Sequence, residues 1–388
     1  MATVKFKETS PYLKPKSSPP AEDYIYSKYI EDLTLKTDNR EEPIVKLALF
    51  GVGHAGTIHI SNIISNTRVQ LLYIVEDLES KWENVRKYWR LDNVTFLNSK
   101  QSDKIFKDPN VNAVIVASPG YTHKDIVIKA LEAKKAVFCE KPIAENISDT
   151  AKVYETAKKA GKPLFCAFQR RFDPSYSNVR DRVHNGEVGH VHTIKSVSRD
   201  SPLLPLEYLK TCSGIFHDTM IHDIDIVTWV IGEYPDKVAV LADANDPEIK
   251  ATVGDFDTVA VIMHFPSGTV GLIDVSHTSS YGYDQRLEVF GPKGMVQANN
   301  VQMNSVQRQY DLQGPTTAPI CFSFPSRYMN GYRRELDHFI DVVHGKVESL
   351  VKSQEILAVS KIATACEESA RTGKIVTLKW TDSELPDN

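Results

Sequence analysis

Residues Val45 to Gly56 read VKLALFGVGHAG, and this stretch decides the fold of the chain. An apolar run of strand length, Leu47 to Phe50, leads into the pattern Gly51-x-Gly53-x-x-Gly56. Behind the glycines, Ile58 to Ile64 is apolar enough to start a helix. A strand, a glycine turn and a helix in this order form the phosphate-binding start of a dinucleotide-binding βαβ unit.

Each glycine of the turn has its own task. Gly51 allows the tight turn, Gly53 lets the backbone approach a pyrophosphate, and Gly56 lets the helix pack closely on the strand. The helix N-terminus faces the phosphate charge. We therefore expect Gly51, Gly53, His54, Ala55 and Gly56 to contact a nucleotide, and an ordinary glycine-rich turn is the alternative.

An acidic pair follows the second strand at the expected distance. Val69 to Val75 reads as a buried strand and ends in Glu76 and Asp77. A carboxylate about 20 residues beyond the last glycine accepts the ribose hydroxyls of NAD and repels the 2′-phosphate of NADP. Glu76 is the first choice and Asp77 the second, unless both only begin a solvated turn. His54 and Arg68 are cations that could soften this preference, so NAD is predicted and NADP stays possible.

Composition excludes several classes of protein. The 388 residues suffice for two domains, and the formal charge of −4 offers no basic surface for nucleic acid. No apolar run is long enough to span a bilayer, and the N-terminus lacks a signal pattern, so we expect a cytoplasmic location without membrane partners. Five scattered cysteines without CxxC spacing fit reduced thiols and no metal site, with Cys139 and Cys166 as small core residues.

Three regions follow from the patterning. Residues 1–42 are rich in Pro, Ser and Lys and read as an N-terminal extension, with at most a short helix from Tyr24 to Leu33. Residues 43–168 alternate apolar strands with crossover helices, which predicts a doubly wound parallel sheet that binds NAD, a Rossmann domain. Residues 169–388 carry runs of consecutive strands, which predicts an α+β domain with a large, mostly antiparallel open sheet for substrate binding and oligomerisation.

The predicted elements have these approximate bounds. Helices are expected at 80–89, 124–133, 147–160, 174–185, 218–231, 332–344 and 353–372, and further strands at 94–97, 112–117, 136–139, 163–168, 190–199, 236–243, 257–265, 269–278, 284–290, 294–298 and 374–380.

The segment Cys139 to Pro142, CEKP, follows directly on a predicted buried strand. Ligands of such sheets bind at the carboxyl ends of the strands, which places Glu140 and Lys141 at the mouth of the cofactor crevice. A lysine there can hold a substrate hydroxyl and help its proton to leave. On spacing alone, a solvated turn lysine is the better interpretation.

The segment His217 to Asp225, HDTMIHDID, opens a predicted helix. Asp218 and His222 are four residues apart and share one helix face, and Asp225 points roughly the same way. A carboxylate beside an imidazole fixes its tautomer and raises its basicity, which suits His222 to the role of a base for a hydroxyl proton. The alternative is that the aspartate only caps the helix.

These motifs in combination resemble the glucose–fructose oxidoreductase and inositol dehydrogenase family. The resemblance runs from about Lys46 to Thr377 and rests on the glycine turn, Glu-Lys-Pro and Asp-x-x-x-His at their spacings. QRRFDPSY from Gln169 and GYDQR from Gly282 look like the inositol dehydrogenase branch. The resemblance implies a dehydrogenase acting on a CH–OH group of a cyclitol or sugar, with myo-inositol as the leading substrate.

Residue roles follow from the resemblance alone. It implies that Lys141, Asp218 and His222 are catalytic, with His222 taking the hydroxyl proton, Lys141 acidifying that hydroxyl and Asp218 supporting the pair. It also implies cofactor contacts from three further segments, which supply Ser118, Pro119, His123, Glu140, Lys141, Gln169 and Arg170. Beside the three catalytic residues, it implies substrate contacts from Arg170, Asp225, Tyr283 and Tyr332. Half-buried packing is an equally good reading of the two tyrosines.

Two departures from the pattern bear on the substrate. The segment Ser198-Arg199-Asp200 usually reads His-Arg-Asn in inositol dehydrogenases, and typical bacterial members lack the N-terminal extension. A related reductase acting on a dihydrodiol or keto-sugar, and a non-catalytic NAD(P)-sensing regulator, are the alternative functions. The resemblance also implies a homo-oligomer, a dimer or tetramer, built on the exposed face of the large sheet.

Overall fold

A computed structural model describes residues 42–308 and 316–386 of the chain. From Ile44 onward the described residues belong to one compact unit. Apart from Glu42, the predicted N-terminal extension lies outside the described residues, and so does the helix expected from Tyr24 to Leu33.

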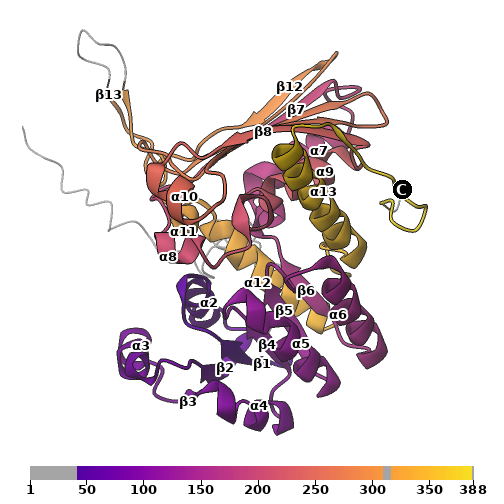
Figure 1. Cartoon of the computed structure of the whole chain (residues 1–388). Helices are drawn as coiled ribbons and strands as arrows, with labels where there is room; N and C mark the ends of the chain where they lie inside the picture. The colour runs from indigo at the N-terminus through magenta and orange to yellow at the C-terminus, as the bar shows by residue number, and fades with distance from the viewer. Residues whose placement is uncertain (1–41, 309–315, 387–388) are drawn as a thin grey trace, which may run out of the picture. The chain divides into compact units, whose positions relative to one another are not determined.

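The first half of the fold is a six-stranded parallel sheet in the order β3-β2-β1-β4-β5-β6 (Figure 1). Its strands are β1 (Val45–Phe50), β2 (Val69–Val75), β3 (Thr95–Leu97), β4 (Ala113–Val116), β5 (Ala136–Glu140) and β6 (Leu164–Ala167). Every residue of β4 and β6 is buried, because helices cover both faces of a doubly wound sheet. Cys139 and Cys166 face each other in register on β5 and β6 and are fully buried, as predicted.

Helices connect these strands. They are α2 (His54–Ile64), η3 (Glu79–Lys81), α3 (Trp82–Trp89), η4 (Ser99–Gln101), α4 (Asp103–Lys107), η5 (Gly120–Thr122), α5 (His123–Glu132) and α6 (Ile147–Ala160). The bounds of α6 agree with the prediction because both ends carry strong signals: Asn146 accepts a hydrogen bond from the backbone of Asp149, and Gly161 takes a left-handed conformation. The five residues of α4 are too few to show helical periodicity, so no sequence pattern predicted this helix.

The second half is a seven-stranded sheet in the order β12-β11-β7-β10-β9-β8-β15. Its strands are β7 (Thr193–Arg199), β8 (Lys237–Asp243), β9 (Thr258–His264), β10 (Val270–Ser276), β11 (Asp284–Gly291), β12 (Gly294–Ala298) and β15 (Val376–Thr377). All neighbours pair antiparallel except β7 and β10, which run parallel. Along the chain, a helical segment separates β7 from β8. In the sheet, β7 lies between β10 and β11, and there it runs parallel to β10. The predicted mostly antiparallel sheet is confirmed, and its last strand is shorter than expected.

The remaining described elements are η6 (Gln169–Phe172), α7 (Pro174–His184), α8 (Leu206–Leu209), a π-helical turn η7 (Ile215–Thr219), α9 (Ile221–Ile231), α10 (Pro247–Thr252), β13 (Gln307–Arg308), β14 (Thr316–Thr317), α11 (Phe324–Arg327), α12 (Met329–Val343) and α13 (Ser353–Thr372). Helices α7, α9 and α13 cover one face of the large sheet (Figure 1). Residues of β9 alternate between buried and exposed, so its second face is open. Within the described part of the chain, no helix has the length and apolar character to cross a bilayer.

Helix α12 joins the two halves. It packs against α2 and η6, and Phe339 contacts Phe138 of the first sheet with ring centroids 5.5 Å apart. On the same helix, Asp337 and Asp341 form ion pairs with Arg68 from the turn before β2. This packing brings the carboxyl end of β5 next to the turn that begins α9, and so it positions the site.

Candidate active site

The glycine turn has the shape of a phosphate cradle. Gly51 has a φ of +91°, and a Cβ there would lie 2.6 Å from the carbonyl oxygen of Ala117. A Cβ on Gly56 would lie 2.1 Å from the oxygen of Gly51, so close packing requires glycine at both positions. A Cβ on Gly53 would meet nothing within 4 Å, which leaves open space at the N-terminus of α2. No acidic side chain occupies the first turn of α2, and this end of the helix fits a pyrophosphate.

The acidic pair lies beside this turn. Glu76 accepts hydrogen bonds from the backbone of Val52 at 3.2 Å and Leu78 at 2.9 Å, and Asp77 accepts one from Ser99 at 2.7 Å. The carboxylate of Glu76 therefore faces the glycine turn, where a ribose would lie.

The two cations that could have favoured NADP differ in availability. Arg68 is ion-paired with Asp337 and Asp341 and is not free for a 2′-phosphate, whereas His54 is exposed at the start of α2. Because Arg68 is held in these ion pairs, it does not attract the 2′-phosphate of NADP, and the site favours NAD.

The loop after β4 is tied to the Glu-Lys-Pro segment by a buried histidine. One ring nitrogen of His123 lies 2.7 Å from the carbonyl oxygen of Pro142, and the other lies 2.8 Å from that of Ser118. The Ser118 hydroxyl also bonds with that of Thr122 at 2.7 Å. His123 is only 1% exposed, so it supports the loop from behind, whereas Ser118 is half-buried and Pro119 is exposed.

Lys141 and Asp218 come together from the two halves of the fold. Lys141 follows β5, and its ammonium donates to the Asp218 carboxylate at 2.7 Å and to the Asp218 carbonyl oxygen at 2.6 Å. Asp218 lies in the π-helical turn, whose start is fixed by Gly214 at a φ of +77° and by a hydrogen bond from Ile215 to Asp255. Both side chains are largely buried, so the pair lies inside the site and is not the solvated turn lysine of the alternative interpretation.

A tyrosine that the sequence analysis did not identify holds the second oxygen of Asp218. The hydroxyl of Tyr208, on α8, donates to this oxygen at 2.9 Å. Burial on its own would raise the pKa of Asp218, but the charge and hydrogen bond of Lys141, with the hydrogen bond of Tyr208, lower that pKa below its usual value. Asp218 is therefore a carboxylate at neutral pH.

His222 lies one helical turn further on, at the start of α9. Burial, and then the charges of Lys141 and Arg170, lower the pKa of this imidazole well below its ordinary value. Among the described residues, Asp218 makes no hydrogen bond to His222, because its two oxygens bind Lys141 and Tyr208. The prediction that Asp218 raises the basicity of His222 is therefore wrong; the imidazole is kept neutral by burial and by two cations.

Asp225 does not join this cluster. It is fully buried, and both of its oxygens accept from the guanidinium of Arg171 at 2.6–3.1 Å. The expectation that Asp225 contacts the substrate is corrected. Asp225 lies three residues after His222, and three residues advance a helix by about 300°, which is less than a full turn. The side chain of Asp225 is therefore directed toward η6. Arg171 also binds Glu355 at 2.7 Å, which makes this a structural ion-pair network.

The guanidinium of Arg170 belongs to a buried network of polar side chains. It donates to Asp223 and to the hydroxyl of Ser198, each at 3.0 Å. Ser196 and Ser198 both donate to Asp223 at 2.6 Å, and Gln285 bonds with Ser198 and Tyr328. The sequence analysis did not identify this network, although serines at alternate positions of an apolar strand were a signal for it.

The remaining predicted residues are buried or half-buried. Tyr283 and Tyr332 are each 6% exposed, and burial is the main cause that raises the pKa of both phenols. Glu140 bonds with the ring of His59 at 2.8 Å, and Gln169 is buried at the start of η6. At the ends of β7 and β10, Asp200 and His277 lie 3.9 Å apart, and the charge of His277 acts on Asp218.

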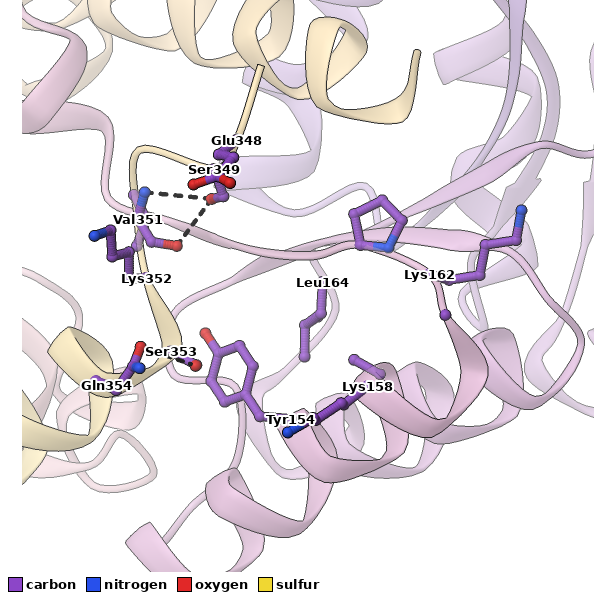
Figure 2. A pocket seen from close by; sticks show the side chains of 13 residues that line it. Tyr154, Lys158, Lys162, Leu164, Glu348, Ser349, Val351, Lys352, Ser353 and Gln354 are labelled. Carbon is purple, nitrogen blue, oxygen red and sulfur yellow. Dashed lines mark hydrogen bonds between the residues drawn. The ribbon is translucent and has the colours of Figure 1, made fainter. Parts of the chain in front are cut away.

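A groove in the described residues lies away from these side chains. Figure 2 shows this groove of about 520 Å³ between the end of α6, the start of β6 and the segment that leads into α13. Its lining includes Lys158, Lys162 and Lys352 and none of the predicted site residues. This groove therefore lies apart from the charge cluster around Lys141 and Asp218.

Two family models match the chain. The model described as "Oxidoreductase family, NAD-binding Rossmann fold" matches residues 45–168, and the model described as "Oxidoreductase family, C-terminal alpha/beta domain" matches residues 180–378. The first match covers the glycine turn and Lys141, and the second covers Asp218 and His222.

Individual relatives match over most of their length. The chain is 35% identical to a myo-inositol 2-dehydrogenase of Thermotoga maritima over 86% of this chain and 99% of that protein. A myo-inositol dehydrogenase structure from Corynebacterium glutamicum matches with a TM-score of 0.80 at 30% identity, covering 87% of this chain and all of that one. A scyllo-inositol dehydrogenase from Lactobacillus casei, solved with NAD(H) and scyllo-inositol, matches with a TM-score of 0.79 at 25% identity, over 86% and 99% of the two chains.

Proposed function

The chain belongs to the glucose–fructose oxidoreductase and inositol dehydrogenase (Gfo/Idh/MocA) family of oxidoreductases and carries its NAD-binding Rossmann domain, and from this premise we propose that it oxidises a ring secondary alcohol of a cyclitol. One observation carries the proposal. Lys141 and Asp218 meet at 2.7 Å beside a neutral His222, at the strand end where the Rossmann sheet binds its ligands. A base, a cation and a supporting carboxylate are the groups that alcohol oxidation needs next to a nicotinamide.

Each residue of this set has a separate task. Bound NAD supplies the acceptor for the hydride that leaves the ring carbon. Lys141 donates a hydrogen bond to the reacting hydroxyl and stabilises the negative charge that develops on its oxygen. His222 takes the hydroxyl proton, and its lowered pKa keeps the imidazole free to accept it at neutral pH. Asp218 orients the lysine ammonium and balances its charge.

The substrate is proposed from the relatives and from the polarity of the site. Myo-inositol is the leading substrate and a 2-keto-inositol the leading product, because the relatives with the printed name inositol 2-dehydrogenase match over nearly their whole length. Asp200, His277, Tyr283 and Tyr332 present hydroxyl-binding groups to a ring that carries several hydroxyls. A dihydrodiol would leave most of these groups without partners.

We also propose that the open face of the second sheet meets another copy of the chain, as the family resemblance implies. Leu241 on β8 is 80% exposed and Ile262 on β9 is 54% exposed, and both point away from the covering helices. Apolar side chains that gather on one open sheet face are typical of a subunit interface.

A substrate panel tests the proposed activity. Myo-inositol, scyllo-inositol, glucose and a dihydrodiol are offered with NAD and with NADP, and the absorbance of the reduced cofactor is followed. We expect turnover with an inositol and NAD, and a rate lower by about 10²–10⁴-fold for Lys141→Ala. NAD binding without turnover of any polyol would favour the sensing regulator instead. Full activity of Lys141→Ala would remove Lys141 from its proposed role.

A further inference from the structure

Tyr208 contacts the catalytic carboxylate from an element outside both motifs. It lies on α8, between β7 and the π-helical turn, ten residues before Asp218. The backbone of α8 is fixed locally, since Tyr208 donates to the carbonyl oxygen of Pro205 and accepts from the N–H of Cys212, each at 2.9 Å. Leu209, next to it, is 5% exposed and anchors the turn in the interior.

The contact completes the coordination of Asp218. One carboxylate oxygen accepts from Lys141 at 2.7 Å and the other from Tyr208 at 2.9 Å. A carboxylate that is hydrogen-bonded at only one oxygen can rotate about its terminal side-chain torsion, because the energy of this torsion changes little with the angle. With a donor on each oxygen the plane of the carboxylate is fixed, and the lysine ammonium is fixed with it.

The tyrosine is a donor to this carboxylate and not a proton source at neutral pH. Partial burial, and then the charge of Asp218 and the hydrogen bond to it, raise the pKa of the Tyr208 phenol above its usual value. Its hydroxyl therefore stays protonated. The ring itself is not a core residue, because Tyr208 is 43% exposed.

We propose that Tyr208 is a positioning residue, which holds the Asp218 carboxylate so that Lys141 is aimed at the reacting hydroxyl of the substrate. This inference rests on the proposed oxidation of a polyol. Tyr208 acts through Asp218 and moves no proton itself. It also makes the segment that carries α8 part of the active site, although no catalytic motif lies on it.

Tyr208→Phe is the direct test, because it removes only the hydroxyl. We expect kcat for the polyol to fall about tenfold, the usual effect of losing a hydrogen bond to a charged group, with KM for NAD and the thermal midpoint unchanged. A loss of kcat at an unchanged KM for NAD is a split that a purely structural role of Tyr208 would not give. The titratable groups that act on Asp218 from other elements, Lys141, Cys212 and His277, stay in place in this variant.

Tyr88→Phe is the matched control. Tyr88 is 77% exposed on α3 and packs against the ring of Trp89, so losing its hydroxyl should leave kcat unchanged. Wild-type kcat in Tyr208→Phe would overturn the inference. A parallel loss of kcat, KM and thermal midpoint would also overturn it, as a purely structural effect. A wild-type protein that turns over no polyol would instead overturn the proposed function, and the inference with it.

Discussion

At the scale of single residues, the site is governed by how charges are paired. Asp218 binds Lys141 and Tyr208, while Asp225 and Asp223, a few residues away, bind Arg171 and Arg170 in the interior. Each of these three carboxylates thus has a cation as its partner, which offsets the cost of burying its charge. His222 is the exception, since no carboxylate bonds to it among the described residues and two cations act on it.

The lowered pKa of His222 predicts an unusual pH dependence. Oxidation needs the neutral imidazole, and burial with the charges of Lys141 and Arg170 keeps its pKa well below 6.5. We therefore expect kcat/KM for the polyol to hold its plateau as the pH falls through 6.5 and to decline only at lower pH. Steady-state rates between about pH 4.5 and 9 measure this profile. An acid limb centred at or above 6.5 would mean that His222 is not the base.

At the scale of elements, the glycine turn and α2 show which sequence signals decide structure. The glycines of this turn serve packing at two positions and ligand access at one, because a Cβ would clash at Gly51 and Gly56 and would meet open space at Gly53. The glycine pattern alone does not separate these roles.

Two substitutions in this turn should separate binding from stability. Gly53→Val fills the open space without a backbone clash, so NAD should bind at least about tenfold more weakly, equivalent to about 1.4 kcal/mol, while the thermal midpoint stays near that of the wild type. Gly56→Ala places its Cβ against the backbone of Gly51 and should destabilise the fold by about 1–3 kcal/mol. Titration calorimetry and thermal unfolding measure the two effects. Unchanged NAD affinity in Gly53→Val would place the pyrophosphate elsewhere.

Much of the fold could be predicted because the apolar periodicities are long. Helices α6 and α13 and the strands around them have strong caps or continuous buried runs. The site was only partly predictable. Lys141 and His222 lie in recognisable motifs, but Tyr208 lies on a four-residue helix that shows no periodicity. The partners of Asp218 and Asp225 could not be assigned, since a π-helical turn before α9 changes the spacing that a regular helix would give.

At the scale of the whole molecule, the second sheet has one covered and one open face. The covered face presents Ser198 and Gln285 to α9 and η6 and forms the floor of the site. The open face presents apolar side chains from neighbouring strands, including Leu241 and Ile262. By our proposals, one sheet thus serves the substrate on one side and a second subunit on the other.

Charges on the open face should separate the subunits. The double variant Leu241→Glu with Ile262→Glu places carboxylates in a desolvated interface, and we expect a shift to a smaller species in sedimentation velocity. Val347→Glu, at an exposed position between α12 and α13, is the control and should leave the assembly intact. A wild-type protein that sediments as a monomer at micromolar concentration would contradict the proposed interface.

The central claim is that a ring carbon of a cyclitol gives its hydride to NAD within this site. The most direct measurement uses myo-inositol deuterated at the ring carbons, with NAD and the wild-type protein, and mass spectrometry of the reduced cofactor. We predict one deuterium in each reduced nicotinamide and no label transfer with Lys141→Ala on the same timescale. Reduced cofactor that carries no deuterium, or no reduction with any inositol, would contradict the account.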